Sequence, residues 1–275
     1  MIDTKTFLKQ YQNREIKFIP NPGNAGDSFI AYATVQMFKE LNLNYQICKP
    51  DDKFNNDTII FGGGGNLAPK YDTCKKFLLH NHRNNKIVVL PHVVNNCDDL
   101  LTNLSNNVTI FAREKVSYNY MKTKMRYLTN ALISDDMAFH VKHLDKYKHT
   151  SCIGECNVFR IDDELRPKNN HVTTPKNNKD ISIDFQRPMY MKNWYISDDD
   201  NTQVEQNISI ATDNIFSYIS KFEQINTNRL HIGIAATLLG KRVNLYPGSY
   251  YKIAAVYDYS IKDKFDNVTF HRSNI

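Results

Sequence analysis

Short runs of apolar, often β-branched residues alternate along the chain with stretches in which apolar positions recur every three or four residues. In the first half the short runs predict strands over residues 16–20, 58–61, 86–90, 108–112 and 131–134. After the first of them, one face of a predicted helix carries Ile30, Thr34, Met37, Phe38 and Leu41. Because strands alternating with helices are typical of crossover-connected parallel sheets, the pattern predicts an α/β fold.

A polar, basic stretch at residues 141–150 predicts a junction, after which the alternation begins again. The second half predicts a strand within CNVFRIDDE, a Pro- and Asn-containing loop over 168–180, strands over 222–226 and 242–246, a helix over 230–239 and a closing helix. At 275 residues the chain is long enough for two domains. We therefore expect an N-terminal α/β domain over 1–147 and a C-terminal one over 148–275.

Composition and charge narrow the class of protein. Hydrophobic residues make up 41% and charged residues 23%, which excludes collagenous, mucin-like and wholly disordered chains. The formal net charge of +6 favours anionic partners only weakly. No apolar run approaches the roughly 18 residues of a membrane span, and the N-terminus is too polar for a signal peptide. We expect a cytoplasmic protein, with association at the inner face of the membrane left open.

Five scattered cysteines favour a reducing compartment over a disulfide framework. Cys152 and Cys156 form the one close pair, but no second Cys or His pair accompanies them. We therefore expect no metal site, and the role of this pair stays open.

Each predicted strand of the first half ends in a loop of unusual composition. Four consecutive glycines, residues 62–65, indicate either a bound ligand or a tight strand-to-helix turn. The run GGGGN lacks the spacing of GxGxxG, and no GxxxxGK[ST] is present, so a dinucleotide fingerprint and a P-loop are both excluded. Because ligands of open parallel sheets bind at the carboxyl ends of the strands, these loops are candidate site segments.

The segment TNRLHIGIAATLLG is the most informative. Asn228 is predicted to cap a helix whose first turn carries Arg229 and His231 beside unpaired backbone N–H groups, which together favour an anion. Arg160, after the first strand of the second half, indicates either a second cationic group or a surface ion pair. Arg113 and Ser117, one helical turn apart, could hold an anion or a neighbouring loop.

Taken in order, these segments resemble the polysaccharide pyruvyl transferase family over most of the chain. The matching stretches are NPGNAGDSFI, IIFGGGGNL, VVLPH, FAREKVSY, ISDDMAF, CNVFRIDDE, TNRLHIGIAATLLGKRVNLY and YYKI. The resemblance implies two Rossmann-like domains in a GT-B-like arrangement, with the active site in the interdomain cleft. It places the acceptor on the N-terminal side and the donor on the C-terminal side.

The resemblance also implies a reaction. Phosphoenolpyruvate would be the donor and co-substrate. The acceptor would be a terminal sugar of a cell-surface polysaccharide or of its precursor, with a lipid-linked precursor included. The products would be a pyruvate ketal and phosphate, with no metal and no cofactor. Candidate donor-binding residues are Arg160, Arg229, Arg113 and Ser117. Candidate cleft-loop residues are Asn24, Gly63, Gly64, Asn66, His92 and Asp136. The family often has Pro-Gln-Ser where this chain has Pro-His-Val, so the wall near His92 is expected to contact a different acceptor.

The catalytic hypothesis assigns the proton transfers to His231 and a positioning or base role to Asp27. A GT-B-type glycosyltransferase with a nucleotide-sugar donor is the alternative, because one fold hosts several donors. A non-catalytic anion- or nucleic-acid-binding protein is a third reading, which the absence of a basic stripe interleaved with aromatics disfavours, and we expect no nucleic-acid partner. The sequence leaves open the acceptor sugar and its hydroxyls, the ketal stereochemistry, the split between acid and base, and the oligomeric state.

Overall fold

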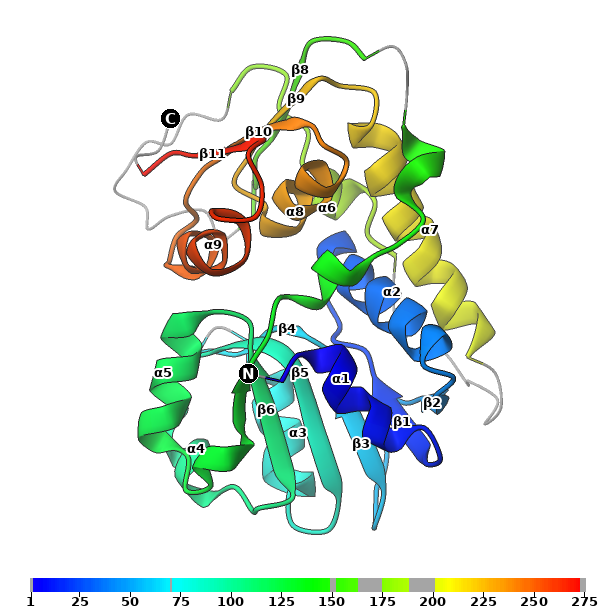
Figure 1. Ribbon diagram of the computed structural model, residues 1–275, viewed down its shortest axis with the longest axis vertical. Helices are drawn as coiled ribbons and strands as arrows, with labels where there is room; N and C mark the ends of the chain where they lie inside the picture. Colours follow the sequence, from blue (N-terminus) through cyan, green and yellow to red (C-terminus); the bar gives the residue numbers. More distant parts are fainter. Residues whose placement is uncertain (1, 70, 149–151, 163–174, 188–200, 273–275) are drawn as a thin grey trace.

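Two parallel β-sheets organise the computed structural model, which describes residues 2–69, 71–148, 152–162, 175–187 and 201–272 (Figure 1). The strands of the first sheet are β1 (Glu15–Ile19), β2 (Asn44–Ile47), β3 (Thr58–Phe61), β4 (Gly64–Leu67), β5 (Lys86–Val94), β6 (Val108–Ala112) and β7 (Ala131–Ile133). They follow the order β2-β1-β3-β5-β6-β7, with β4 paired to β5. The second sheet has the order β11-β10-β9-β8 and contains β8 (Glu155–Val158), β9 (Gln224–Thr227), β10 (Arg242–Leu245) and β11 (Val268–Phe270). The predicted α/β class is confirmed.

Helices cover both faces of the first sheet. The α-helices are α1 (Thr4–Leu8), α2 (Ala25–Glu40), α3 (Thr73–Asn81), α4 (Asp98–Asn103), α5 (Lys115–Lys124), α6 (Ile181–Asp184), α7 (Thr202–Ile219), α8 (Leu230–Leu238) and α9 (Lys252–Val256). Apolar side chains of α3, α4 and α5 pack on one face of the first sheet, and those of α1 and α2 pack on the other. Burial on both faces explains the nearly continuous apolar strands of this half. None of the helices in the described ranges combines the length and apolarity that a membrane span requires.

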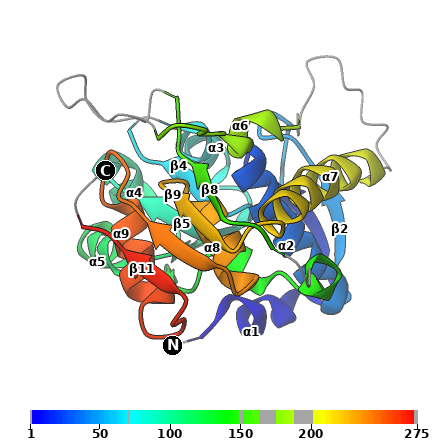
Figure 2. The same ribbon diagram turned by 90° about the horizontal axis from the view of Figure 1, so that it is seen from above.

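The second sheet packs its apolar side chains on one face. Its apolar side chains join those of α7 and α8 in a cluster that also includes the α2 side of the first sheet. The other face carries a row of asparagines, in which Asn226 donates to Asn157 over 2.9 Å and Asn244 donates to Asn226 over 2.8 Å. Helices α2 and α7 lie side by side in both views (Figures 1 and 2), and the rings of Phe29 and Phe216 pack 5.1 Å apart. A shared core therefore fixes the two sheets against each other.

The expected division at residue 147 falls between the last strand of the first sheet and the first strand of the second, and it stays a prediction. Residues 149–151 and 168–174, part of the expected junction and loop, lie outside the described residues.

Several element boundaries differ from the prediction. The glycine run is not all loop, because Gly64 begins β4, which pairs with β5. Strand β5 does not stop before Pro91 but continues to Val94, and the register shift between Val89 and His92 accommodates a residue without an N–H group. Helix α7, with no counterpart among the predicted elements, has buried apolar positions at helical spacing.

Candidate functional site

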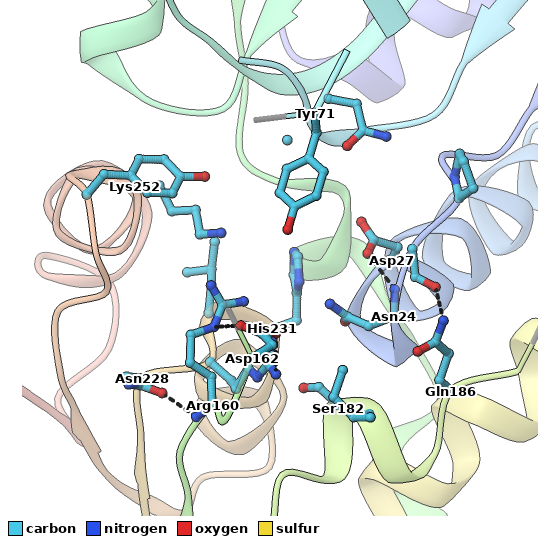
Figure 3. A pocket seen from close by; sticks show the side chains of 18 of the residues that line it. Asn24, Asp27, Tyr71, Arg160, Asp162, Ser182, Gln186, Asn228, His231 and Lys252 are labelled. Atoms are coloured by element: carbon cyan, nitrogen blue, oxygen red, sulfur yellow. Dashed lines mark hydrogen bonds and ion pairs between the residues drawn. The ribbon is translucent and has the colours of Figure 1, made fainter. Parts of the chain in front are cut away.

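A pocket of about 340 Å³ lies between the loops of the two sheets. It is lined by Pro22, Gly23, Asn24, Asp27, Gly65, Asn66, Tyr71, Thr73, Arg113, Arg160, Asp162, Ser182, Ile183, Gln186, Asn228, Arg229, Leu230, His231, Tyr250 and Lys252. Figure 3 shows Arg160 and Lys252 on one side of this space, Asn24 and Asp27 on the opposite side, and His231 between them. The carboxyl ends of strands from both sheets therefore meet at one site, as expected for parallel sheets.

Arg160 follows β8 and is buried. Its backbone N–H donates to Oδ1 of Asn228, over 2.8 Å, which ties the loop after β8 to the loop after β9. Its Nε lies 3.3 Å from Oδ1 of Asp162. The predicted capping role of Asn228 is wrong, since Arg229 is the N-cap residue of α8 and makes no side-chain cap bond. The amide of Asn228 joins two loops instead.

Arg229 is held from behind by a buried carboxylate. Its Nε donates to Oδ1 of Asp180 over 2.9 Å, its Nη2 donates to the other oxygen of the same carboxylate, and Nη2 also lies 2.8 Å from Oδ2 of Asp162. The remaining nitrogen, Nη1, is buried and has no hydrogen-bond partner among the described residues. Since a buried donor without a partner is unfavourable, Nη1 is suited to an incoming anion.

A buried ion pair joins the end of β6 to the segment after β7, and His231 at the start of α8 lies against it. Nη1 of Arg113 donates to Oδ2 of Asp136 over 2.7 Å, and Nε2 of His231 lies 3.5 Å from the same oxygen. Burial alone would raise the pKa of Asp136, but the hydrogen bond from His231 and the charge of Arg113 together hold the pKa of this carboxyl below its ordinary value. Asp136 is therefore ionised at neutral pH and anchors both side chains.

The opposite wall begins with the capping box of α2. The side chain of Asn24 accepts from the N–H of Gly26 over 2.8 Å, and Oδ2 of Asp27 accepts from the N–H of Asn24 over 3.0 Å. Burial raises the pKa of Asp27 above its ordinary value. A Cβ atom on Gly26 would lie 2.6 Å from Nδ1 of His231, so only glycine lets this imidazole sit against the start of α2.

A chain of hydrogen bonds runs behind this wall. Nε2 of the fully buried His92 accepts from the N–H of Asn66 over 3.0 Å. The Asn66 amide donates to Oδ1 of Asn21 over 2.6 Å, and the Asn21 amide donates to Asp27 over 3.3 Å. Burial lowers the pKa of His92 to about 3, so the imidazole stays neutral and can accept this bond. Gly64, with φ of +148°, has Asn21 where a Cβ would be.

The structure brings most predicted site residues together. Seven of them line the pocket: Asn24, Asp27, Asn66, Arg113, Arg160, Arg229 and His231. The remaining five, Gly63, Gly64, His92, Ser117 and Asp136, do not line it. Asp136 and His92 each contact a residue that lines the pocket: Asp136 contacts Arg113, and His92 contacts Asn66. The hydroxyl of Ser117 accepts from the N–H of Val94 over 2.8 Å. The carboxylate of Glu114 caps the start of α5.

Other lining residues were absent from the prediction. Lys252 at the start of α9 enters the pocket, and burial together with the nearby arginine charges holds the pKa of its amine well below its ordinary value. Tyr71, Ser182 and Tyr250 line the pocket, and Gln186 donates to the carbonyl of Gly23 over 3.2 Å. The stretch YYKI contained Lys252, but no spacing rule connected it to the arginines.

No group of three or more His, Cys, Asp or Glu side chains within the described ranges is arranged to hold a metal ion. The five cysteines form no disulfide.

Fold and pocket together define a parallel α/β protein whose pocket gathers arginines, a lysine and a histidine at strand ends. The family described as "Polysaccharide pyruvyl transferase" matches residues 24–246, and the chain belongs to this family. Membership makes it a transferase, supports a role in polysaccharide pyruvylation and implies a sugar or polysaccharide acceptor.

Two individual proteins resemble the chain over most of its length. The Bacillus subtilis (strain 168) protein named "Putative pyruvyl transferase EpsO" is 24% identical, over 86% of this chain and 81% of that protein. The crystal structure of an uncharacterised protein from Klebsiella pneumoniae superposes with a TM-score of 0.80 at 31% identity, covering 98% of this chain and 97% of the other.

Proposed function

We propose that the protein transfers the pyruvyl group of phosphoenolpyruvate to a terminal sugar of a polysaccharide or its precursor, forming a pyruvate ketal and releasing phosphate. The proposal rests on Nη1 of Arg229, which has no hydrogen-bond partner among the described residues. Arg160 and the start of α8 lie beside it in the pocket. Phosphoenolpyruvate carries a carboxylate and a phosphate, and guanidinium groups bind both bidentately. Unpaired N–H groups at the helix start add to this attraction.

In the proposed reaction the vinyl carbon of the donor takes a proton, and the adjacent carbon forms a bond to a sugar hydroxyl oxygen. The C–O bond to phosphate then breaks, and a second hydroxyl closes the ketal. Two hydroxyl protons leave the sugar in total, which balances the proton gained by the methyl group and the one taken by the released phosphate or a base. His231 would supply the first proton, and Asp27 on the opposite wall would accept a proton from the attacking hydroxyl.

The electrostatics of the pocket support this division of roles. The raised pKa of Asp27 makes its carboxylate a better base than an ordinary aspartate. Asp136 holds His231 from behind. Burial and the arginine charges lower the pKa of Lys252, and an anionic donor beside it would raise that pKa and favour the protonated amine. Donor affinity should therefore rise as the pH falls toward the pKa of Lys252.

The finer structural assignments belong to the same proposal. Two parallel sheets with a pocket between their loops support a GT-B-like arrangement, with the donor on the second-sheet side and the acceptor on the first-sheet side. The arginines supply positive charge from the chain itself, so the proposed reaction uses no metal or resident cofactor. A cytoplasmic location and an acceptor presented at the inner face of a membrane complete the proposal.

Thermal unfolding with phosphoenolpyruvate, and in parallel with a panel of nucleotide sugars, tests the donor. A ligand that binds only the folded protein raises the unfolding midpoint. We expect a shift with phosphoenolpyruvate that disappears in Arg229→Ala and persists in Arg242→Ala, an arginine exposed on β10. A shift with a nucleotide sugar alone would replace the proposal by a glycosyltransferase.

A further inference from the structure

A second hollow lies next to the pocket on the side of the first sheet. Its volume is about 830 Å³. It is lined by residues 50–55, after β2, and by one face of α3 and the residue before it, namely Asp72, Thr73, Lys76, Phe77, His80 and Asn81. We call it the side groove. Thr73 lines both the side groove and the pocket, so the two hollows are neighbours. Tyr71, two residues earlier and 42% exposed, points into the pocket (Figure 3).

The pocket is too small for a polymer. At about 340 Å³ it falls near the lower end of the roughly 300–1,000 Å³ of small-molecule sites. A donor and one terminal sugar would occupy it, so the other sugars of a polysaccharide acceptor must leave through its mouth. This step rests on the proposed function. The side groove, more than twice as large, begins at the shared residue Thr73.

The chemistry of the side groove differs from that of the pocket. Its floor is aromatic, with Phe54 half-buried above the buried Phe77 and the ring centroids 5.8 Å apart. Apolar ring faces suit the C–H faces of pyranose rings. Its rim offers exposed carboxylate and amide groups, among them Asp51 and Asn55, which accept or donate hydrogen bonds to hydroxyls.

The charge of the rim is nearly balanced. Three aspartates face two lysines, and Lys76 lies 3.0 Å from the carboxylate of Asp72. Such a rim attracts neither phosphate groups nor a nucleic acid, in contrast to the arginines of the pocket. A neutral ligand rich in hydroxyls fits it best.

We propose that the side groove binds the inner, neutral sugars of the acceptor glycan, next to the terminal sugar held in the pocket. The test is calorimetry of the full chain with monosaccharides and hexasaccharides of β-linked glucose, galactose, mannose and N-acetylglucosamine. At least one hexasaccharide should bind about tenfold more tightly than its monosaccharide, the gain from one or two added hydrogen bonds.

The double variant Asp51→Ala, Asn55→Ala removes two exposed rim side chains and leaves the aromatic floor in place. It should abolish the gain with chain length, whereas Asp263→Ala, an exposed change elsewhere, should preserve it. The proposal is contradicted if no hexasaccharide binds better than its monosaccharide, or if the gain persists in the double variant.

A parallel thermal-shift measurement with phosphoenolpyruvate separates this proposal from the proposed function. If phosphoenolpyruvate raises the unfolding midpoint but hexasaccharides bind no better than monosaccharides, the side-groove proposal alone is wrong. A length effect without a donor shift supports the side groove and overturns the proposed donor.

Discussion

The loops that follow β1 and β3 and those that follow β8 and β9 use the same structural device with different chemistry. In each pair, two adjacent parallel strands end at the pocket, and an asparagine side chain joins the segments that follow them. In the first sheet Asn21, after β1, accepts from Asn66 in β4, the short strand after β3; in the second, Asn228 accepts from the N–H of Arg160. The first pair then presents amides, glycines and one carboxylate. The second pair presents two arginines and a helix start.

This difference shows how one fold separates recognition tasks. The first-sheet loops need glycine because side chains approach their backbone closely, as Asn21 does at Gly64 and His231 does at Gly26. The second-sheet loops need buried carboxylates such as Asp180, which hold the arginines in place without a ligand. We call the pocket lining from the first sheet the first wall and that from the second sheet the second wall. We infer that the first wall positions the reacting groups and that the second wall supplies positive charge. The following variants test that contrast, from the largest expected effect to the smallest.

Asp136→Asn should cause the largest loss, because it leaves the buried charge of Arg113 without its partner. We expect the free energy of unfolding at pH 7 to fall by about 3–5 kcal/mol, measured by urea denaturation. The pKa of Asp136 is lower in the folded than in the unfolded protein, so its stabilisation is present above the unfolded value near 4 and is lost as the pH falls further. The difference in the free energy of unfolding between the parent and Asp136→Asn should therefore become smaller in acid.

Asp135→Asn is the matched control for that measurement. Asp135 pairs with Lys264 near the surface, where an ion pair contributes about 1 kcal/mol or less. Equal losses in the free energy of unfolding for the two variants would show that the Arg113–Asp136 pair contributes no more than a surface ion pair.

Arg229→Ala should lower the affinity for phosphoenolpyruvate by about 100-fold, as expected for losing two charge-assisted hydrogen bonds. Arg229→Lys should recover only part of the affinity, because an ammonium group cannot make the bidentate pair with Asp180 that holds the guanidinium in place. Calorimetry at neutral pH measures both, with circular dichroism confirming the fold. An unchanged affinity for phosphoenolpyruvate in Arg229→Ala would contradict the placement of the donor at the second-sheet loops.

Gly26→Ala should act on turnover more than on donor binding. The new Cβ would lie 2.6 Å from Nδ1 of His231, so the imidazole must move. We expect kcat to fall about tenfold, in line with misplacement of an acid–base group, while the Kd for phosphoenolpyruvate changes little. In Gly248→Ala the added atom meets a flexible Ile253 side chain at 3.4 Å, and kcat should stay near that of the parent. Equal kcat values for Gly26→Ala and the parent would show that the first wall does not position His231.

Ser117→Ala should have the smallest effect and concerns stability alone. Its hydroxyl accepts a hydrogen bond from Val94 and does not line the pocket. We expect a loss of about 1 kcal/mol in the free energy of unfolding and an unchanged affinity for phosphoenolpyruvate. A large loss of donor affinity would restore Ser117 to the donor site that the sequence predicted.

The sequence predicted those features that local pattern controls. Apolar runs located β1, β3, β6 and β10 within one or two residues. Because strand ends collect at one edge of a parallel sheet, Arg160 and His231 could be assigned to a common site before any contact was known, and the family resemblance added Asp27.

Features that depend on tertiary packing were not predictable from pattern. Lys252 enters the pocket from the short helix α9, and Asp180 reaches Arg229 across 49 residues of chain. The amide of Asn228 had two uses, a helix cap or a loop tie, and only the position of Arg160 decides between them. The support that His92 gives to Asn66 likewise requires the shifted register of β5.

The central claim is that the second-sheet wall holds the anionic donor. A crystal structure of the protein with phosphoenolpyruvate tests it most directly. The account predicts the donor's carboxylate and phosphate oxygens within hydrogen-bond distance of Arg160 and of Nη1 of Arg229. A donor bound instead against Asn24 and Asn66, with Arg229 contacting only Asp162 and Asp180, would contradict it.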